Sequence, residues 1–155
     1  INLMFAVYIF LFCMIFVIFL DFLKLKIVIF SLLMCCVFSD IGGYFIGKFF
    51  QGPKLTKISP NKTLSGAFGS IFFSVLIFIL LMFYYTKSVN LNIFIVAIIT
   101  SLACQFGDLL FSYIKRSAKV KDTGNFFPGH GGILDRIDGI LLGLPIGFLS
   151  FVFIK

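Results

Sequence analysis

The sequence predicts an all-α fold, a polytopic helical membrane protein with about five transmembrane helices. Hydrophobic residues fill 61% of the 155 positions and charged residues only 12%, and the mean hydropathy is +1.15. This composition is typical of membrane proteins and not of soluble domains. The apolar stretches also continue far beyond the roughly 10 residues of a barrel strand, which favours helices over a transmembrane barrel.

Five apolar segments are each close to the roughly 20 residues that a membrane helix needs. They cover about residues 1–20, 27–49, 63–85, 91–114 and 134–154. We expect one transmembrane catalytic region over residues 1–155, and we interpret a chain that starts at Ile1 as the C-terminal part of a longer protein. The first segment has no basic leader and no small-residue cleavage site, so we predict a span there and not a signal peptide.

Basic residues concentrate in two of the four connections, 50–62 and 115–133, whereas the other two connections carry only Lys24, Lys26 and Lys87. The positive-inside rule therefore predicts that 50–62 and 115–133 are cytoplasmic loops. The net charge of +7 comes from these short loops, where it reports topology and attracts anionic headgroups or phosphates. Nucleic acid is not an expected partner.

The second segment ends with Asp40, Gly43, Gly47 and Lys48 in the run SDIGGYFIGK. Asp40 precedes Lys48 by eight residues, so at 1.5 Å per residue it lies roughly 12 Å below the cytoplasmic end of the helix. Glycines at helical spacing allow another helix to approach closely. A packing seam explains these glycines, but it does not explain a carboxylate at that depth.

The loop GPKLTKISPNKT leads into the third segment. Pro60 marks a helix start there, with Ser59 or Asn61 as candidate N-caps. Free backbone N–H groups beside Lys57 and Lys62 would suit a phosphate. An ordinary capped helix with positive-inside lysines explains these residues equally well.

The fourth segment carries a polar stripe, which consists of Ser101, Gln105, Asp108, Ser112 and Lys115 at steps of four, three, four and three. This spacing places all five side chains on one face of a helix. Lipid would leave such groups unsatisfied, so the stripe must face the bundle or a water-filled cavity. Asp108 lies roughly 10 Å deep by the same measure, which predicts that it shares one cytoplasmic cavity with Asp40.

The stretch 101–138 concentrates the polar chemistry of the chain. It holds four of the six carboxylates, the only histidine, both arginines and the turn PGHGG. Asp135 and Asp138 stand three residues apart at the start of the fifth segment, on one helix face. In a membrane protein such a cluster indicates a functional site. Pro145, further along the fifth segment, predicts a kink.

Carboxylates from several helices form an oxygen ligand set that suits Mg²⁺. The basic residues around them would neutralise phosphate, and the amides of PGHGG could cradle an anion. This pattern favours phosphoryl or nucleotidyl transfer, in which positioning and electrostatic stabilisation dominate. His130 could donate to a phosphate, act as acid or base, or only shape its turn.

The run SYIKRSAKVKDTGNFFPGHGGILDRID, Ser112 to Asp138, resembles the signature of the phosphatidate cytidylyltransferase family, also called CDP-diacylglycerol synthases. The upstream runs DIGGYFIGKFFQGPKLTKISPNKTLSGAFG and QFGDLL resemble other recurring stretches of that family in the same order. The resemblance covers about Phe38 to Pro145. It implies a multi-pass enzyme of the inner (cytoplasmic) membrane, with its active site facing the cytoplasm. Such an enzyme uses Mg²⁺ to condense CTP with phosphatidic acid into CDP-diacylglycerol and pyrophosphate during phospholipid biosynthesis.

The resemblance also assigns candidate site residues by motif position. Asp108 and Asp135 are the leading metal ligands, with Asp138 as a supporting partner in the metal site. The predicted catalytic and phosphate-handling residues are Asp108, Ser112, Lys115, Arg116, Lys121, Asp122, His130 and Arg136. The predicted cofactor-binding residues are Lys62, Gly129, Gly131 and Gly132.

Two other functions stay open at this point. One is a CTP-dependent polyprenol or other lipid kinase, which passes on a terminal phosphate and not a cytidylyl group. The other is a membrane transporter that uses the carboxylates as an ion path. The expected partners are CTP, phosphatidic acid and the lipid bilayer, and a homodimer is an open expectation.

Overall fold

The computed structural model describes residues 2–19, 22–56, 62–120 and 134–154, without the side chains of residues 2–6, 15, 19, 135 and 136. Within these ranges the fold is helical, and no strand is present beyond a single bridge between Lys54 and Thr63. The predicted all-α fold class is therefore confirmed. The helices are α1 (Asn2–Phe19), α2 (Leu23–Phe50), α3 (Leu64–Thr86), α4 (Leu91–Ser117) and α5 (Leu134–Phe153).

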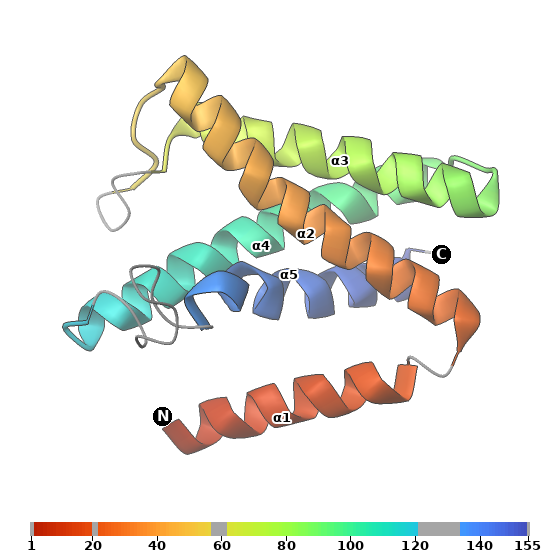
Figure 1. Cartoon of the computed structure of the whole chain (residues 1–155), viewed down its shortest axis with the longest axis horizontal. Helices are drawn as coiled ribbons and strands as arrows, with labels where there is room; N and C mark the ends of the chain where they lie inside the picture. Colours follow the sequence, from red (N-terminus) through yellow and green to blue (C-terminus); the bar gives the residue numbers. More distant parts are fainter. Residues whose placement is uncertain (1, 20–21, 57–61, 121–133, 155) are drawn as a thin grey trace.

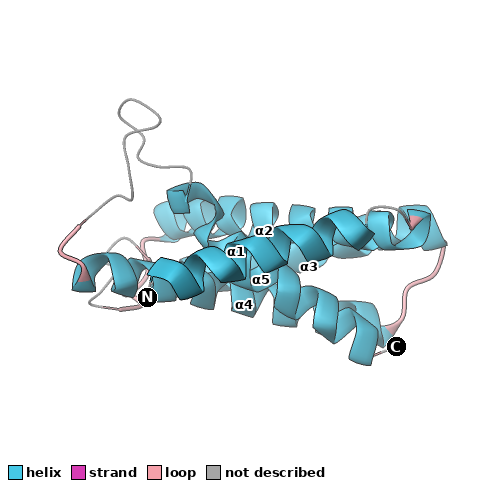
Figure 2. Cartoon of the chain, turned by 90° about the horizontal axis from the view of Figure 1, so that it is seen from below, coloured by secondary structure: helices cyan, strands magenta, loops and turns pink. Residues whose placement is uncertain are grey.

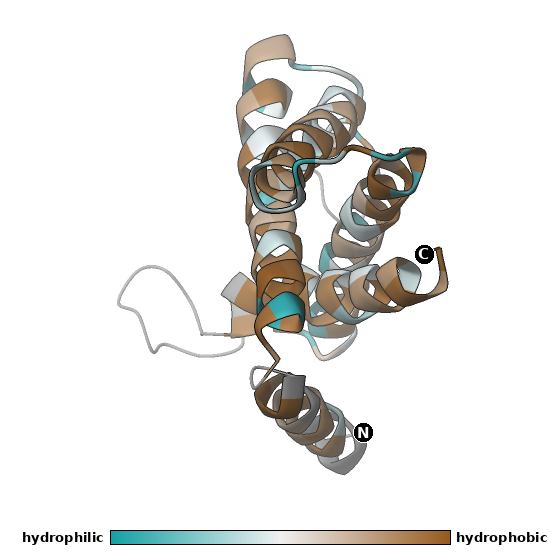
Figure 3. Ribbon diagram, turned by 90° about the vertical axis from the view of Figure 1, so that its right-hand side faces the viewer, coloured by the Kyte–Doolittle hydropathy of each residue, from teal (hydrophilic) through white to brown (hydrophobic). Residues whose placement is uncertain are grey.

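The described helices have the length and composition of a multi-pass membrane protein. α2, α3 and α4 are each long and apolar enough to cross a bilayer, and α1 and α5 contain the shorter apolar stretches Val7–Ile18 and Ile137–Phe153. Large apolar side chains on their outer faces are exposed, for example Phe45, Phe68 and Phe72. Figure 3 shows that hydrophobic residues predominate along the helices. This surface suits lipid.

The helices pack in two close pairs, which are joined by contacts of α3 with α4 and of α2 with α4 and α5. α2 packs most extensively on α3, and α4 packs on α5, while α2 also runs diagonally across α4 and α5 (Figure 1). α1 lies to one side of this group, and α5 is its main neighbour among the described helices (Figures 1 and 2). The end of α2, the start of α3, the end of α4 and the start of α5 all lie at one end of the molecule.

Glycines set the close approach within both pairs. A Cβ atom at Gly66 would lie 2.8 Å from the carbonyl oxygen of Gly43, so α2 and α3 meet backbone to backbone. In the other pair, a Cβ atom at Gly143 would lie 3.2 Å from the Cα atom of Cys104 on α4. Small residues permit such contacts between membrane helices. The predicted packing role of the α2 glycines is confirmed.

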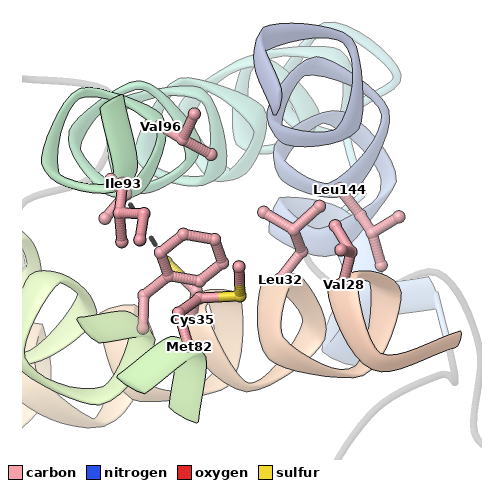
Figure 4. Close-up of a cluster of buried hydrophobic side chains, with 9 residues drawn as sticks. Val28, Leu32, Cys35, Met82, Ile93, Val96 and Leu144 are labelled. Carbon is pink, nitrogen blue, oxygen red and sulfur yellow. Dashed lines mark hydrogen bonds between the residues drawn. The ribbon is translucent and has the colours of Figure 1, made fainter. Parts of the chain in front are cut away.

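The apolar core lies in the half of the bundle away from the loops that follow α2 and α4. Its side chains come from the first half of α2, the second half of α3, the first half of α4 and the middle of α5 (Figure 4). They are Val28, Leu32, Cys35, Phe78, Met82, Ile93, Val96, Ala97 and Leu144. This half is filled mainly by apolar side chains, whereas the carboxylates of α2, α4 and α5 lie in the other half.

Candidate active site

The turn between α2 and α3 brings Lys62 to the start of α3. Residues 54–55 pair with 62–63, and the Leu55 N–H donates to the Lys62 carbonyl at 2.7 Å. Thr63 is the N-cap of α3, because its side chain accepts a hydrogen bond from the Gly66 N–H at 3.1 Å. The prediction of Ser59 or Asn61 as the cap was wrong, since this pairing keeps the chain extended through Lys62 and delays the helix start.

A cavity of about 410 Å³ opens between α2, α3, α4 and α5 at the polar end of the bundle. Asp40, Asp108 and Asp138 reach it from three different helices, and Lys62 reaches it from the loop before α3. Apart from the aliphatic Leu55, the remaining lining residues are small, polar or aromatic: Gly43, Tyr44, Thr63, Gly66, Ala67, Ser70, Gln105 and Ser112. The structure thus places Asp40 and Asp108 at one cavity, as their predicted depths require.

Two ion pairs hold carboxylates at this cavity. The Lys62 ammonium lies 2.8 Å from Oδ2 of Asp108, with exposed side-chain fractions of 31% and 20%. The Lys115 ammonium lies 3.4 Å from Oδ2 of Asp138, and both side chains are 15% exposed. The Gly139 N–H also donates to Oδ1 of Asp138 at 3.0 Å. Partly buried pairs of this kind fix both charges in place more firmly than pairs at an open surface.

The three carboxylates form one electrostatic group. Asp40 interacts with both Asp108 and Asp138, and those two interact with each other. The Cys104 thiol donates to Asp40 at 3.7 Å from the neighbouring α4. Like charges held this close attract a cation. Asp40 is absent from the metal and catalytic residues predicted from the sequence, and its depth in the helix was the sequence signal that pointed to this cavity.

The polar stripe of α4 runs from the protein interior into the cavity. Ser101 is buried and shares a 3.1 Å hydrogen bond with Ser39 of α2. One turn on, the Gln105 amide donates to the Ala67 carbonyl at 3.3 Å and to the Ser101 hydroxyl at 3.4 Å. These bonds tie α4 to α2 and α3 directly beneath Asp108. The prediction that the stripe faces the bundle is confirmed.

The other predicted site residues divide into three groups. Ser112 lines the cavity, whereas Arg116 is exposed in the last turn of α4 and does not line it. Asp135 and Arg136 lie in the first turn of α5, but the structure does not describe where their side chains point. The last group lies outside the described residues altogether: Lys121, Asp122, Gly129, His130, Gly131 and Gly132. The predicted meeting of Asp108 with Asp135 therefore stays a prediction.

The donor set of the cavity fits Mg²⁺. Its ligand atoms are oxygens, from Asp40, Asp108, Asp138, Gln105 and Ser112. The described part of the chain contains no group of three or more Asp, Glu, His or Cys side chains already arranged to hold a metal. Mg²⁺ usually needs only one or two protein carboxylates, because water and substrate phosphates fill the other positions. Asp108 and Asp138, which interact with each other at the cavity, could provide such a pair.

Comparison with known proteins agrees with this chemistry. The model of the cytidylyltransferase family matches residues 1–154. A phosphatidate cytidylyltransferase of Staphylococcus aureus (strain COL) is 42% identical over 110 residues, which cover 70% of this chain and 42% of the relative. The protein of that name from Rickettsia bellii (strain RML369-C) is 42% identical over 126 residues, 76% of this chain and 54% of the relative.

A third relative, the phosphatidate cytidylyltransferase of Staphylococcus epidermidis (strain ATCC 35984), is 39% identical over 124 residues, 79% of this chain and 47% of the relative. The chain thus spans about half the length of the curated relatives it matches. The family match, in contrast, extends over nearly all of the chain, including the helices that carry Asp40, Asp108 and Asp138. The chain belongs to the cytidylyltransferase family.

Proposed function

We propose that the full-length protein transfers the cytidylyl group of CTP to phosphatidic acid, which yields CDP-diacylglycerol and pyrophosphate for phospholipid synthesis. The observation that supports this most strongly is the cavity itself. In a chain of the cytidylyltransferase family, three carboxylates and two lysine ion pairs converge at the polar end of an apolar bundle. A lipid substrate can reach such a site with its phosphate while its acyl chains stay in the membrane.

We place the enzyme in the inner (cytoplasmic) membrane, with the cavity open to the cytoplasm where CTP is present. Support comes from the lysines and arginines next to the cavity end of the helices, including Lys48, Lys54, Lys62, Lys115 and Arg116. Cytoplasmic loops carry such an excess of basic residues. Among them, Lys62 at the cavity and Lys115 beside it would attract the triphosphate and the anionic lipid headgroup.

In the proposed reaction a phosphate oxygen of phosphatidic acid attacks the α-phosphorus of CTP. The bond from that phosphorus to the oxygen that bridges to the β-phosphorus breaks, and pyrophosphate leaves with the electron pair. Bound Mg²⁺, held by Asp108 and Asp138 and predicted to involve Asp135, would neutralise charge on the phosphate oxygens. Lys62 and Lys115 hold these carboxylates and add positive charge beside them. The hydroxyl of Ser112 can donate to a phosphate oxygen.

The position of the label in the lipid product tests this proposal against a kinase. Purified full-length protein in detergent receives phosphatidic acid, Mg²⁺ and CTP labelled in the cytosine ring. Cytidylyl transfer moves the ring label into the lipid fraction and releases one pyrophosphate per labelled lipid. A lipid kinase leaves the ring label in the aqueous fraction, and an ion transporter releases no pyrophosphate. Either of these two results would refute the proposal.

Lys62→Met is expected to lower kcat/KM for CTP by roughly 10- to 100-fold, which corresponds to losing the free energy of one hydrogen bond to a charged group. Lys62 holds Asp108 at 2.8 Å and lines the cavity, so its loss leaves that carboxylate unpaired and removes a cation from the phosphate site. Steady-state kinetics on the full-length protein measure the effect. Lys54→Met is the matched control, because Lys54 lies in the same turn but is exposed outside the cavity. Equal kinetics for the two variants would contradict a role for Lys62.

A further inference from the structure

α5 contains a proline in its interior, which leaves one backbone carbonyl of the helix without its usual partner. The helix continues from Leu134 to Phe153 with Pro145 inside it. Proline has no N–H, so the carbonyl four residues earlier, that of Leu141, loses its helical partner. Leu141 is only 2% exposed, and the membrane interior offers no water as a substitute. This carbonyl therefore needs a donor from another part of the protein.

Tyr8 of α1 supplies that donor. Its hydroxyl donates a hydrogen bond to the Leu141 carbonyl, across 133 residues of sequence. Tyr8 and Pro145 also line the same small cavity of about 270 Å³ between α1, α2 and α5. Its other lining side chains are all apolar: Leu11, Phe12, Phe16, Ile29, Leu144 and Phe148. Tyr8 thus carries the single hydroxyl among the lining residues. That hydroxyl donates its hydrogen bond to the Leu141 carbonyl, which Pro145 leaves without a helical partner.

This bond has consequences beyond one carbonyl. α1 has α5 as its main neighbour among the described helices (Figure 1), so the bond adds a polar contact to the apolar packing of Phe12 and Phe16 against the core. Leu141 lies one turn after Asp138, which faces the larger cavity and pairs with Lys115. A helix that lacks one internal hydrogen bond at this point can bend there. The bond to Tyr8 therefore reaches α5 one turn beyond Asp138, where the helix lacks its own hydrogen bond.

We propose that the Tyr8 hydroxyl replaces the backbone N–H that Pro145 cannot donate to the Leu141 carbonyl. Through this bond α1 stabilises the position of the α5 turn that carries Asp138. Tyr8 is a positioning residue in this account and does not contact the substrates. The effect on helix packing stands independently of the catalytic activity. The expected effect of Tyr8 on catalysis, through the position of Asp138, rests on the proposed cytidylyl transfer.

A double-mutant cycle tests the replacement, because Pro145→Ala restores the N–H that Leu141 lacks. Tyr8→Phe in the otherwise unchanged full-length protein is expected to lower the Tm in detergent by roughly 2–4 °C. In the Pro145→Ala background the same change should have little effect. Tyr84→Phe is the control, since Tyr84 is 67% exposed. An equal Tm loss in both backgrounds, or none in the original one, would overturn the proposal.

Isotope-edited infrared spectroscopy reports on the carbonyl itself. With the label placed at the Leu141 carbonyl by semisynthesis, Tyr8→Phe should move its amide I band to higher wavenumber, and Pro145→Ala should reverse that shift. An unchanged band would exclude the bond. In kinetics, Tyr8→Phe should lower kcat more than it raises the KM for CTP. If the unaltered protein transfers no cytidylyl group, the proposed function fails, while the Tm and infrared results still decide the role of Tyr8.

Discussion

Asp108→Asn is expected to lower kcat of the full-length enzyme by at least on the order of 10²–10³-fold, the cost of removing one preorganised charge-stabilising group. Asp108 lines the cavity, where it pairs with Lys62 and interacts with Asp138 across the α4–α5 contact. A Cβ atom at Gly139 would collide with its carboxylate, so the side chain lies directly against α5. The amide keeps this shape but removes the negative charge that a cation requires.

The measurement is single-turnover formation of labelled CDP-diacylglycerol, accompanied by the Tm of each variant. The fold should persist, because the substitution is nearly isosteric and lies at a cavity and not within the apolar core. Tyr113→Phe serves as the control on the same helix, since Tyr113 is 59% exposed and faces away from the cavity. Turnover of Asp108→Asn that matches this control would refute the assignment of the cavity.

Gly69→Val is expected to lower the free energy of unfolding by about 1–3 kcal/mol, the usual cost of overpacking. A Cβ atom at Gly69 would lie 2.7 Å from Cγ1 of Ile46 and 2.8 Å from the carbonyl oxygen of Gly42. A backbone carbonyl cannot rotate away, so α2 and α3 must separate. Gly43, Gly66 and other residues of the same seam line the cavity that we propose as the active site, and activity should therefore fall together with stability.

Reversible denaturation in detergent measures this loss. Leu76→Phe is a suitable control, because it also adds volume to α3 but at a side chain that is 46% exposed. The control should change stability by no more than about 0.5 kcal/mol. A Gly69→Val protein as stable as the control would show that the two helices do not meet as closely as the structure indicates.

The fold could be predicted from the sequence because long apolar runs leave few alternatives to membrane helices. The ends of the helices were less certain. α2 begins at Leu23, before the predicted residue 27, and so includes Lys24 and Lys26 in its first turns. Long lysine side chains can extend from a helix end toward the membrane surface, so charge there does not end the helix. For the same reason α4 continues to Ser117 and includes Lys115 and Arg116.

The part of the site that lies on one helix was predictable, and the parts that join helices were not. The spacing of Gln105, Asp108 and Ser112 defines one face of α4 without any tertiary information. The Lys62–Asp108 pair, in contrast, joins residues 46 positions apart through a turn whose pairing delays the start of α3. The Tyr8–Leu141 bond spans 133 positions. Its only sign in the sequence was Pro145, which we interpreted as a kink and not as a carbonyl in need of a donor.

Photo-crosslinking with a CTP analogue tests most directly whether the cavity between α2, α3, α4 and α5 is the nucleotide site. Full-length protein in detergent is irradiated with an analogue that carries a photoreactive group on its triphosphate, and the adducts are mapped by mass spectrometry. We predict adducts at cavity residues such as Lys62, Gln105 and Ser112, which excess CTP abolishes. Adducts that CTP does not displace, or that map to lipid-facing side chains such as Phe68 and Tyr113, would contradict this assignment.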